Sequence, residues 1–268
     1  EMAFCGSSGM THLVVHQLHK SFGGVKAVDN VSFEVAPGEL VALIGPNGAG
    51  KSTTFNVING QWSPDCGDVL LEGRSLIGLT PQQVWRFGVG RTFQTAAVFG
   101  SMSVLENVQT VLMSRDRRFF DLFSKATGYQ QAEALSLIEQ VGLVEMAHQR
   151  CQALAYADVK RVELALALAS APRWLLMDEP TAGMAPAERQ ALMTLTHALA
   201  KQQRIGVLFT EHSMDVVFGY ADRILVMAQG RLIAQGTPTE IQSNEQVQSV
   251  YFGRQQPVLV SAVLEGVP

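Results

Sequence analysis

The pattern of hydrophobic and polar residues divides the chain into stretches typical of strands and stretches typical of helices. Residues 31–35 alternate apolar and polar side chains, as a half-buried strand does. Residues 39–44 form an apolar run typical of a strand, and Pro37 and Gly38 introduce it with a turn. The first part of the chain therefore predicts short strands joined by tight turns.

In the rest of the chain, up to about residue 234, predicted strands and helices alternate. Between about residues 103 and 171 apolar residues recur at helical spacing, as Val104, Leu105 and Val108 do. The other expected elements are a hairpin over 69–74, a short helix over 81–87, strands over 89–94, 173–178 and 205–210, a helix over 187–203, and a closing hairpin of residues 223–227 and 231–234. This alternation predicts an α/β fold with a mostly parallel sheet, into which the helical block is inserted.

Composition narrows the class of protein. Apolar residues make up 47% of the 268 residues and charged residues 16%, so the chain can bury a large core, and some apolar surface is expected to meet a partner. The net charge of −4 does not favour nucleic-acid binding. Cys5, Cys66 and Cys151 fit neither a disulfide framework nor a zinc site and favour a reducing compartment. No apolar run reaches the roughly 20 residues that span a bilayer.

The two ends of the chain carry no motif. Residues 1–9 are expected to lie outside the native chain, with Met10 as its start. Residues 10–253 are expected to form one domain. Residues 254–268 are expected to be a tail, in which a short apolar stretch could be a strand, a helix or disordered.

A glycine-rich loop between a predicted strand and a predicted helix is the strongest motif. It fits the pattern G-x-x-x-x-G-K-[ST] of a phosphate-binding loop. Glycines let backbone N–H groups turn toward a phosphate, and the helix expected over 53–58 adds partial positive charge. Lys51 is expected to reach the β- and γ-phosphates and Ser52 to hold Mg²⁺. The expected nucleotide-binding residues of the loop are Gly45, Pro46, Asn47, Gly48, Ala49, Gly50, Lys51, Ser52 and Thr53.

Two adjacent carboxylates follow the apolar run over 174–177. Ligand sites in open α/β sheets lie at the carboxyl ends of strands, so Asp178 and Glu179 are expected beside the glycine-rich loop. Asp178 is expected to bind Mg²⁺, directly or through water, and Glu179 to act as general base on the attacking water. The alternative is a solvated strand end without a chemical role.

Together these motifs resemble the ATP-binding subunits of ABC transporters, and among them those of the branched-chain (hydrophobic) amino-acid uptake systems. The resemblance covers about residues 13–253, and its closest local matches are residues 179–184, residues 210–214 and the long helical insert after Gln94. It implies a P-loop NTPase core of the ABC ATPase type, with a mostly parallel sheet, an antiparallel β subdomain and an inserted helical subdomain over about 96–171.

The resemblance also assigns roles to three further residues. Phe22 matches the aromatic residue that stacks on adenine, and the alternative is a core phenylalanine near a strand end. Gln94 matches the glutamine that ligates Mg²⁺ and reports the nucleotide state to the membrane partner, and the alternative is an ordinary polar strand end. His212 matches the histidine that contacts the γ-phosphate and positions water, and the alternative is a structural histidine. The catalytic set is then Glu179, His212 and Gln94, and the metal ligands are Ser52, Gln94 and Asp178.

The segment that corresponds to the family's signature departs from its pattern. The family has Leu-Ser-Gly-Gly-Gln or, in this branch, Leu-Ser-Tyr-Gly-Gln, whereas this chain has Leu154, Ala155, Tyr156, Ala157 and Asp158. The serine hydroxyl that binds the γ-phosphate held by the opposite subunit is therefore missing. Asp158 is expected to be the N-cap of a helix over 159–170, and its carboxylate would be unfavourable close to a triphosphate. Ala185 also stands where the family usually has Asp or Asn.

The resemblance implies the ATP-hydrolysing subunit of a bacterial ABC importer for branched-chain amino acids or related small polar solutes. Such a subunit is peripheral, on the cytoplasmic face of the inner (plasma) membrane, and uses ATP and Mg²⁺. Its partners are ABC permease (transmembrane) subunits, a second ATPase subunit, with a heterodimer favoured, and indirectly a periplasmic substrate-binding protein, but no nucleic acid. Residues 96–106, around Phe99 and Met102, are expected to line the groove for a permease helix.

Two other functions stay open on the sequence. A nucleotide-binding regulatory module with little turnover would fit Ala155 and Asp158 but not Glu179 and His212. An ABC ATPase of translation or DNA repair would carry two P-loops or a long coiled coil, and this sequence has neither. The altered signature also predicts asymmetry: this chain's own P-loop site hydrolyses well, and the site that its signature completes for a partner is slower.

Overall fold

Two β-sheets form the frame of the structure, a computed structural model that describes residues 12–92, 98–116 and 130–252. The larger sheet has six strands in the order β10-β9-β3-β8-β7-β6. Its strands are β3 (Leu40–Ile44), β6 (Val89–Thr92), β7 (Trp174–Asp178), β8 (Gly206–Thr210), β9 (Arg223–Ala228) and β10 (Arg231–Gly236). All neighbours in this sheet are parallel except β9 and β10, which form the closing hairpin.

The smaller sheet is antiparallel throughout and has the order β2-β1-β4-β5. Its strands are β1 (Leu13–Phe22), β2 (Val25–Val35), β4 (Cys66–Leu71) and β5 (Arg74–Ser75). The predicted combination of a mostly parallel sheet and an antiparallel one is therefore confirmed. The first hairpin is longer than residues 31–35 suggested, because β2 already begins at Val25.

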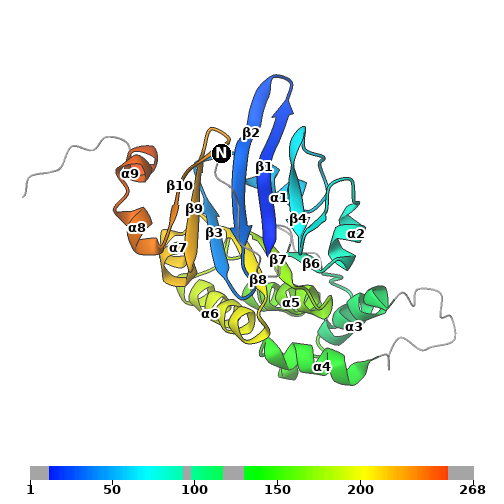
Figure 1. Cartoon of the computed structure of the whole chain (residues 1–268). Helices are drawn as coiled ribbons and strands as arrows, with labels where there is room; N and C mark the ends of the chain where they lie inside the picture. Colours follow the sequence, from blue (N-terminus) through cyan, green and yellow to red (C-terminus); the bar gives the residue numbers. More distant parts are fainter. Residues whose placement is uncertain (1–11, 93–97, 117–129, 253–268) are drawn as a thin grey trace, which may run out of the picture.

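Helices occupy the connections, and three of the helices in the described ranges begin with a capping box. They are α1 (Lys51–Ile58), α2 (Pro81–Arg86), α3 (Val104–Arg115), α4 (Gln131–Gln140), α5 (Tyr156–Ala169), α6 (Pro186–Gln203), α7 (Met214–Tyr220), α8 (Pro238–Gln242) and α9 (Glu245–Phe252), with 3-10 turns at Val144–Met146 and Cys151–Ala153. Ser103 caps α3 and exchanges hydrogen bonds with Glu106, and Thr80 and Thr237 cap α2 and α8 in the same way. Helices α3, α4 and α5 pack against one another at one end of the molecule (Figure 1).

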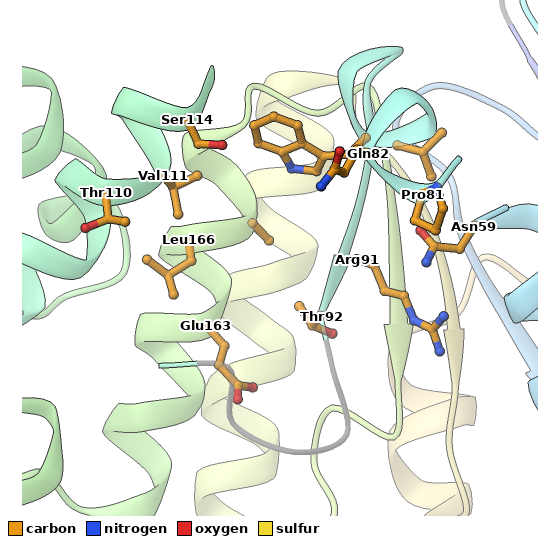
Figure 2. Close-up of a pocket in the computed structure, with 13 residues that line it drawn as sticks. Asn59, Pro81, Gln82, Arg91, Thr92, Thr110, Val111, Ser114, Glu163 and Leu166 are labelled. Atoms are coloured by element: carbon orange, nitrogen blue, oxygen red, sulfur yellow. The ribbon is translucent and has the colours of Figure 1, made fainter. Parts of the chain in front are cut away.

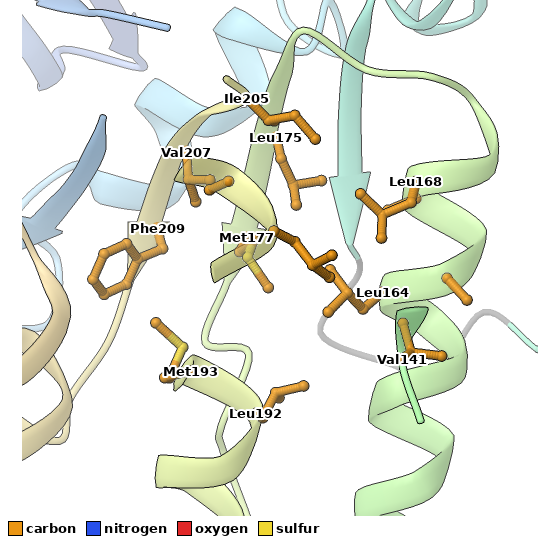
Figure 3. Close-up of a cluster of buried hydrophobic side chains, with 14 of the residues drawn as sticks. Val141, Leu164, Leu168, Leu175, Met177, Leu192, Met193, Ile205, Val207 and Phe209 are labelled. Carbon is orange, nitrogen blue, oxygen red and sulfur yellow. The ribbon is translucent and has the colours of Figure 1, made fainter. Parts of the chain in front are cut away.

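The two hydrophobic cores explain why the central strands are apolar along their whole length. One core lies between the six-stranded sheet and helices α3 to α7, where Leu164 and Leu168 of α5 meet Leu175 and Met177 of β7 (Figure 3). The other lies between the two sheets and surrounds α1, with Phe55 and Ile58 fully buried. A strand covered on both faces favours a continuous apolar run. Within the described ranges, no helix has both the length and the apolar character needed to cross a bilayer.

Candidate nucleotide site

Three neighbouring parallel strands bring the predicted site residues to one edge of the six-stranded sheet. Strand β8 lies between β3 and β7, and its last residue, Thr210, is in register with Leu43 of β3 and Asp178 of β7. The loop that follows β3 is the glycine-rich loop. Its residues and the acidic pair therefore meet at the carboxyl edge, where open α/β sheets bind ligands.

The glycine-rich loop depends on glycine at two positions where other backbone approaches closely. A Cβ on Gly50, whose φ is +102°, would lie 2.2 Å from the Ala27 carbonyl oxygen. A Cβ on Gly45 would lie 2.3 Å from the Met227 carbonyl oxygen. Gly50 is also the N-cap of α1, and no side chain caps the first turn of that helix. The uncapped N–H groups of this turn suit an anion.

Lys51 lies in the first turn of α1 with only 8% of its surface exposed. Its Nζ donates hydrogen bonds to the carbonyl oxygens of Gly45 at 2.6 Å and Pro46 at 3.1 Å. Burial lowers the pKa of Lys51, and the charges of Glu179 and Asp178 oppose this by raising it. The register of β3, β8 and β7 brings the loop before Lys51 and the acidic pair to the same edge of the sheet, which is consistent with one site.

Asp178 is held from two sides. The Thr210 hydroxyl donates to Oδ1 at 2.7 Å, and Nη2 of Arg91 lies 3.5 Å from Oδ2. Arg91 also donates from Nη1 to Oδ1 of Asn56 in α1, at 2.9 Å. Burial lowers the pKa of Arg91, and the charge of Asp178 opposes that shift. Arg91 thus joins α1, β6 and the end of β7 around one carboxylate.

Glu179 has an unusual backbone and an organised side chain. Its φ of +49° lies in the left-handed region, which costs a non-glycine residue about 1–3 kcal/mol and tends to occur at functional sites. Its N–H donates to both the carbonyl oxygen and the hydroxyl oxygen of Thr210, each at 3.1 Å. Oε1 lies 3.0 Å from Nε2 of His212, so two of the three residues predicted to be catalytic are in contact.

Glu211 fixes the loop that follows Glu179. It is 4% exposed, and its Oε1 accepts hydrogen bonds from the N–H of Thr181 at 2.9 Å and the hydroxyl of Thr181 at 2.6 Å. Its Oε2 accepts from the N–H of His212 at 3.2 Å. Sequence reasoning missed Glu211, Thr210 and Arg91 as site residues. The signal for Glu211 and Thr210 was their place at the end of an apolar strand, and for Arg91 it was a charge inside a predicted strand.

The remaining predicted nucleotide residues are distributed around this centre. Ser52 is exposed on the first turn of α1, and Pro46, Asn47 and Gly48 are exposed at the tip of the loop. Phe22 ends β1 with 43% of its surface exposed, so the alternative of a core phenylalanine is wrong. Gln94 lies outside the described residues.

The altered signature segment forms the N-terminus of α5, and the expected cap is wrong. The helix begins at Tyr156 with Ala155 as N-cap, because the N–H groups of Asp158 and Val159 both bond to the Ala155 carbonyl. Asp158 therefore lies inside the first turn, with Oδ1 3.9 Å from Nη1 of Arg161. Leu154 directly follows the preceding 3-10 turn, and Ala157 lies beside Asp158 in the helix.

Tyr156 connects this helix to the segment after Glu179. Its hydroxyl donates to the Ala182 carbonyl oxygen at 3.1 Å, and Gly183 lies against its ring. The buried ammonium of Lys160 lies 5.6 Å from the centre of the same ring and pairs with Glu163. The N-terminus of α5 and the loop after the acidic pair therefore pack as one unit.

A groove of about 460 Å³ opens beside the site (Figure 2). It is lined by Asn59, Pro81, Gln82, Trp85, Val89, Arg91, Thr92, Thr110, Val111, Ser114, Glu163, Leu166 and Ala167. None of the described residues 98–106 lines this groove. Phe99, which belongs to that segment, is 57% exposed. Arg91 lines the groove and also contacts Asp178, so the groove adjoins the carboxylate site.

Comparison with known proteins agrees with this geometry. Residues 28–182 match the ABC transporter family, and residues 231–256 match the branched-chain amino acid ATP-binding cassette transporter family. The chain is 40% identical to the high-affinity branched-chain amino acid transport ATP-binding protein LivG of Escherichia coli (strain K12), over 90% of this chain and 97% of that protein. It is 36% identical to BraF of Pseudomonas aeruginosa, which carries the same description, over 90% of this chain and 97% of BraF.

Other relatives and solved structures extend the match. The chain is 35% identical to the lipopolysaccharide export system ATP-binding protein LptB of Escherichia coli (strain K12), over 91% of this chain and 98% of LptB. It superposes on the ADP conformation of an ATP-binding cassette of an ABC transporter with a TM-score of 0.81 and 31% identity, over 91% and 99% of the two chains. A nucleotide-free ATP-binding cassette gives a TM-score of 0.79 and 30% identity, over 90% and 99%. The chain belongs to the ABC transporter family of ATP-binding proteins, in its branched-chain amino acid branch.

Proposed function

We propose that this chain hydrolyses ATP to power an importer of branched-chain amino acids or related small polar solutes. LivG and BraF, both described as branched-chain amino acid transport proteins, support the substrate class. The observation that carries the hydrolytic role is the contact between Glu179 and His212, 3.0 Å apart, at the same carboxyl edge of the sheet as the glycine-rich loop that precedes Lys51. This arrangement supports a phosphate-binding role for Lys51 and a proton-accepting role for Glu179.

ATP is the substrate of the proposed reaction. Residues 45–53 and Phe22 bind it, with the phosphates on the N–H groups of the loop and the adenine on the Phe22 ring. Lys51 exchanges its bonds to Gly45 and Pro46 for bonds to the β- and γ-phosphates. A water oxygen attacks the γ-phosphorus, and the bond from that phosphorus to the bridging oxygen of ADP breaks. Glu179 accepts a proton from the water, and His212, 3.0 Å away, orients Glu179 and contacts the γ-phosphate.

Magnesium fits the polar groups at this edge. Ser52, exposed on the first turn of α1, and Asp178 supply the hard oxygen donors that this ion prefers, and Gln94 would add an amide oxygen. Bound there, the ion would neutralise charge on the β- and γ-phosphates. Thr210 and Arg91 hold the Asp178 carboxylate in place for this role.

The assembly we propose has ATP between this chain's P-loop and the signature of a second ATPase subunit. This chain's own segment, Leu154 to Asp158, faces the partner's ATP in return. Permease subunits bind on the groove lined by Trp85 and Val111. This groove is mostly apolar and also includes Arg91, which contacts Asp178, so a change in the groove can reach the nucleotide site. We place the assembly at the cytoplasmic face of the inner membrane, with a periplasmic binding protein delivering the solute.

Phosphate release from Mg-ATP by the purified chain tests the proposal. Glu179→Gln keeps the size of the side chain but removes the base, so we expect kcat to fall about 10²- to 10⁴-fold while Mg-ATP binding persists. Glu139→Gln makes the same change on the exposed face of α4 and serves as the control. Equal activity of both variants would rule out Glu179 as the base.

A further inference from the structure

Two aromatic rings touch each other on the surface beside the proposed adenine position. The centroids of Phe22 and Trp62 lie 5.0 Å apart, and the ring planes are inclined by 71°. Phe22 is 43% exposed and Trp62 is 39% exposed. Edge-to-face pairs of this kind contribute beyond their buried area, and they fix the orientation of both rings. The pair therefore presents an oriented aromatic surface to solvent.

Asp65 ties the segment after α1 to the end of β1. Its Oδ1 accepts from Nζ of Lys20 at 3.0 Å, its Oδ2 accepts from the N–H of Ser21 at 2.6 Å, and its own N–H donates to the His19 carbonyl at 2.8 Å. These bonds surround the residue immediately before Phe22. The Lys20 ammonium lies 5.3 Å from the centre of the Phe22 ring, which adds a cation–π contact.

The same segment is anchored on the helix of the glycine-rich loop. The N–H of Trp62 donates to the carbonyl oxygen of Asn56 in α1, at 3.2 Å. On the other side of the hairpin, the Ala27 carbonyl in β2 contacts Gly50, the N-cap of α1. Two routes therefore connect Phe22 to α1, one through Trp62 and the other through Ala27 of the neighbouring strand. A rotation of the Phe22 ring would break its edge-to-face contact with Trp62, and a shift of the backbone at Ser21 would break its hydrogen bond to Asp65.

We propose that Trp62 and Asp65 are positioning residues for the purine base, acting through Phe22. This inference rests on the proposed function, in which Phe22 stacks on adenine, and adds what sets the place of that ring. Trp62 fixes the inclination of the Phe22 ring, and Asp65 fixes the backbone that carries it. Trp62 and Asp65 therefore affect the contribution of the base to nucleotide affinity and leave the contribution of the phosphates unchanged.

Calorimetric titration with Mg-ATP and with Mg-tripolyphosphate, which lacks a base, tests the proposal in the Glu179→Gln background. We expect Trp62→Ala to weaken Mg-ATP binding about 3- to 10-fold and to leave Mg-tripolyphosphate binding unchanged. Asp65→Ala should act in the same direction, and Trp62→Phe should restore most of the affinity. In the Phe22→Ala background, itself about 5- to 150-fold weaker, Trp62→Ala should cause no further loss.

The outcomes are distinguishable. An equal loss for both ligands would show that Trp62 supports the fold of the loop and would overturn the inference. An unchanged Mg-ATP affinity, or a full additional loss in the Phe22→Ala background, would overturn it as well, with the proposed function intact. A parent protein that binds neither ligand would instead reject the proposed function, and the inference with it.

Discussion

The first turns of α1 and α5 are both helix N-termini without a side-chain cap, but they carry opposite charges. Helix α1 starts after Gly50 with Lys51 and Ser52 and has no acidic residue in its first turn. Helix α5 starts after Ala155 and has Asp158 in its first turn. The first arrangement favours binding of a phosphate. In the second, the Asp158 carboxylate offsets the partial positive charge of the helix N-terminus and so weakens its attraction for a phosphate.

The residues around the two helix N-termini also differ, because the charged groups beside α1 are held by closer contacts than Asp158 in the first turn of α5. Beside α1, Thr210 and Arg91 hold Asp178, and His212 contacts Glu179. At α5 the residues of the signature are exposed or half-buried, and the charge of Asp158 is only partly met by Arg161, at 3.9 Å. The comparison teaches that the residues around α1 are arranged as the proposed hydrolytic half of a nucleotide site requires, whereas the first turn of α5 carries a carboxylate where the proposed complementary half would meet a phosphate.

Removing the cation of the first turn should have the largest effect on nucleotide affinity. Lys51→Ala deletes a charged donor to the phosphates, worth about 1.5–3 kcal/mol per hydrogen bond, so Mg-ATP affinity should fall about 10- to 100-fold or more. Lys201→Ala, which removes an exposed charge paired with Asp222, is the matched control and should leave the affinity unchanged. Titration calorimetry measures both, and equal affinities would contradict a phosphate-binding role for Lys51.

The two composite sites of the proposed assembly should be unequal. Glu179→Gln in this chain should remove most of the ATPase activity, and the matching substitution in the second ATPase subunit should remove much less. The missing serine contact explains the difference, because a hydrogen bond to a charged oxygen is worth about 1.5–3 kcal/mol, or roughly 10- to 100-fold in rate. Equal losses of activity would end the asymmetry idea.

Restoring the signature sharpens the same test. The combined variant Ala155→Ser, Ala157→Gly and Asp158→Gln should raise the hydrolysis rate at the slower site, which this segment completes for the partner's P-loop, by about 10-fold. The isolated chain should hydrolyse ATP at its original rate, because its own site does not contain this segment. A faster isolated chain would mean that the segment completes an ATP site of this same chain, either in its own molecule or in a second copy paired with it.

The hydroxyl of Thr210 should matter more for stability than an ordinary buried hydroxyl. Thr210→Val removes the donor to the Asp178 carboxylate and should lower the free energy of unfolding by about 1.5–3 kcal/mol. Thr196→Val, whose hydroxyl bonds only to the Leu192 carbonyl in α6 among the contacts described, should cost about 0.5–1.5 kcal/mol. Urea unfolding measures the two values, and a smaller loss for Thr210→Val would contradict the assigned role.

Loss of the Tyr156 hydroxyl should have the smallest effect. Tyr156→Phe removes one neutral hydrogen bond to Ala182 at a half-exposed position, so the free energy of unfolding should fall by about 0.5–1 kcal/mol. A loss above about 2 kcal/mol in the same urea experiment would show that the signature end is more tightly held than the comparison says.

Local pattern predicted the central part of the fold because the central strands are buried on both faces. The runs over 39–44, 173–178 and 205–210 became β3, β7 and β8 within a residue or two at each end. The glycine-rich loop was equally visible, since its turn needs glycine at fixed positions. The helix after it starts at Lys51 instead of residue 53, because Gly50 serves as N-cap.

Contacts between distant segments were not predictable from local pattern. Arg91 and Asp178 are 87 residues apart, and Thr210 and Asp178 are 32 residues apart, so no spacing rule joins them. The prediction of the N-cap of α5 was wrong for another reason. Asp158 has the strongest N-cap preference in its segment, but Tyr156 is held by Ala182 and Gly183, and this tertiary contact favours a start three residues earlier.

A crystal structure of the Glu179→Gln variant with Mg-ATP tests the central claim most directly. The account predicts a triphosphate on residues 45–53, with its γ-phosphate bonded to the Lys51 amine and next to the side chains at positions 179 and 212. A nucleotide bound elsewhere, or one whose γ-phosphate points away from position 179, would contradict it.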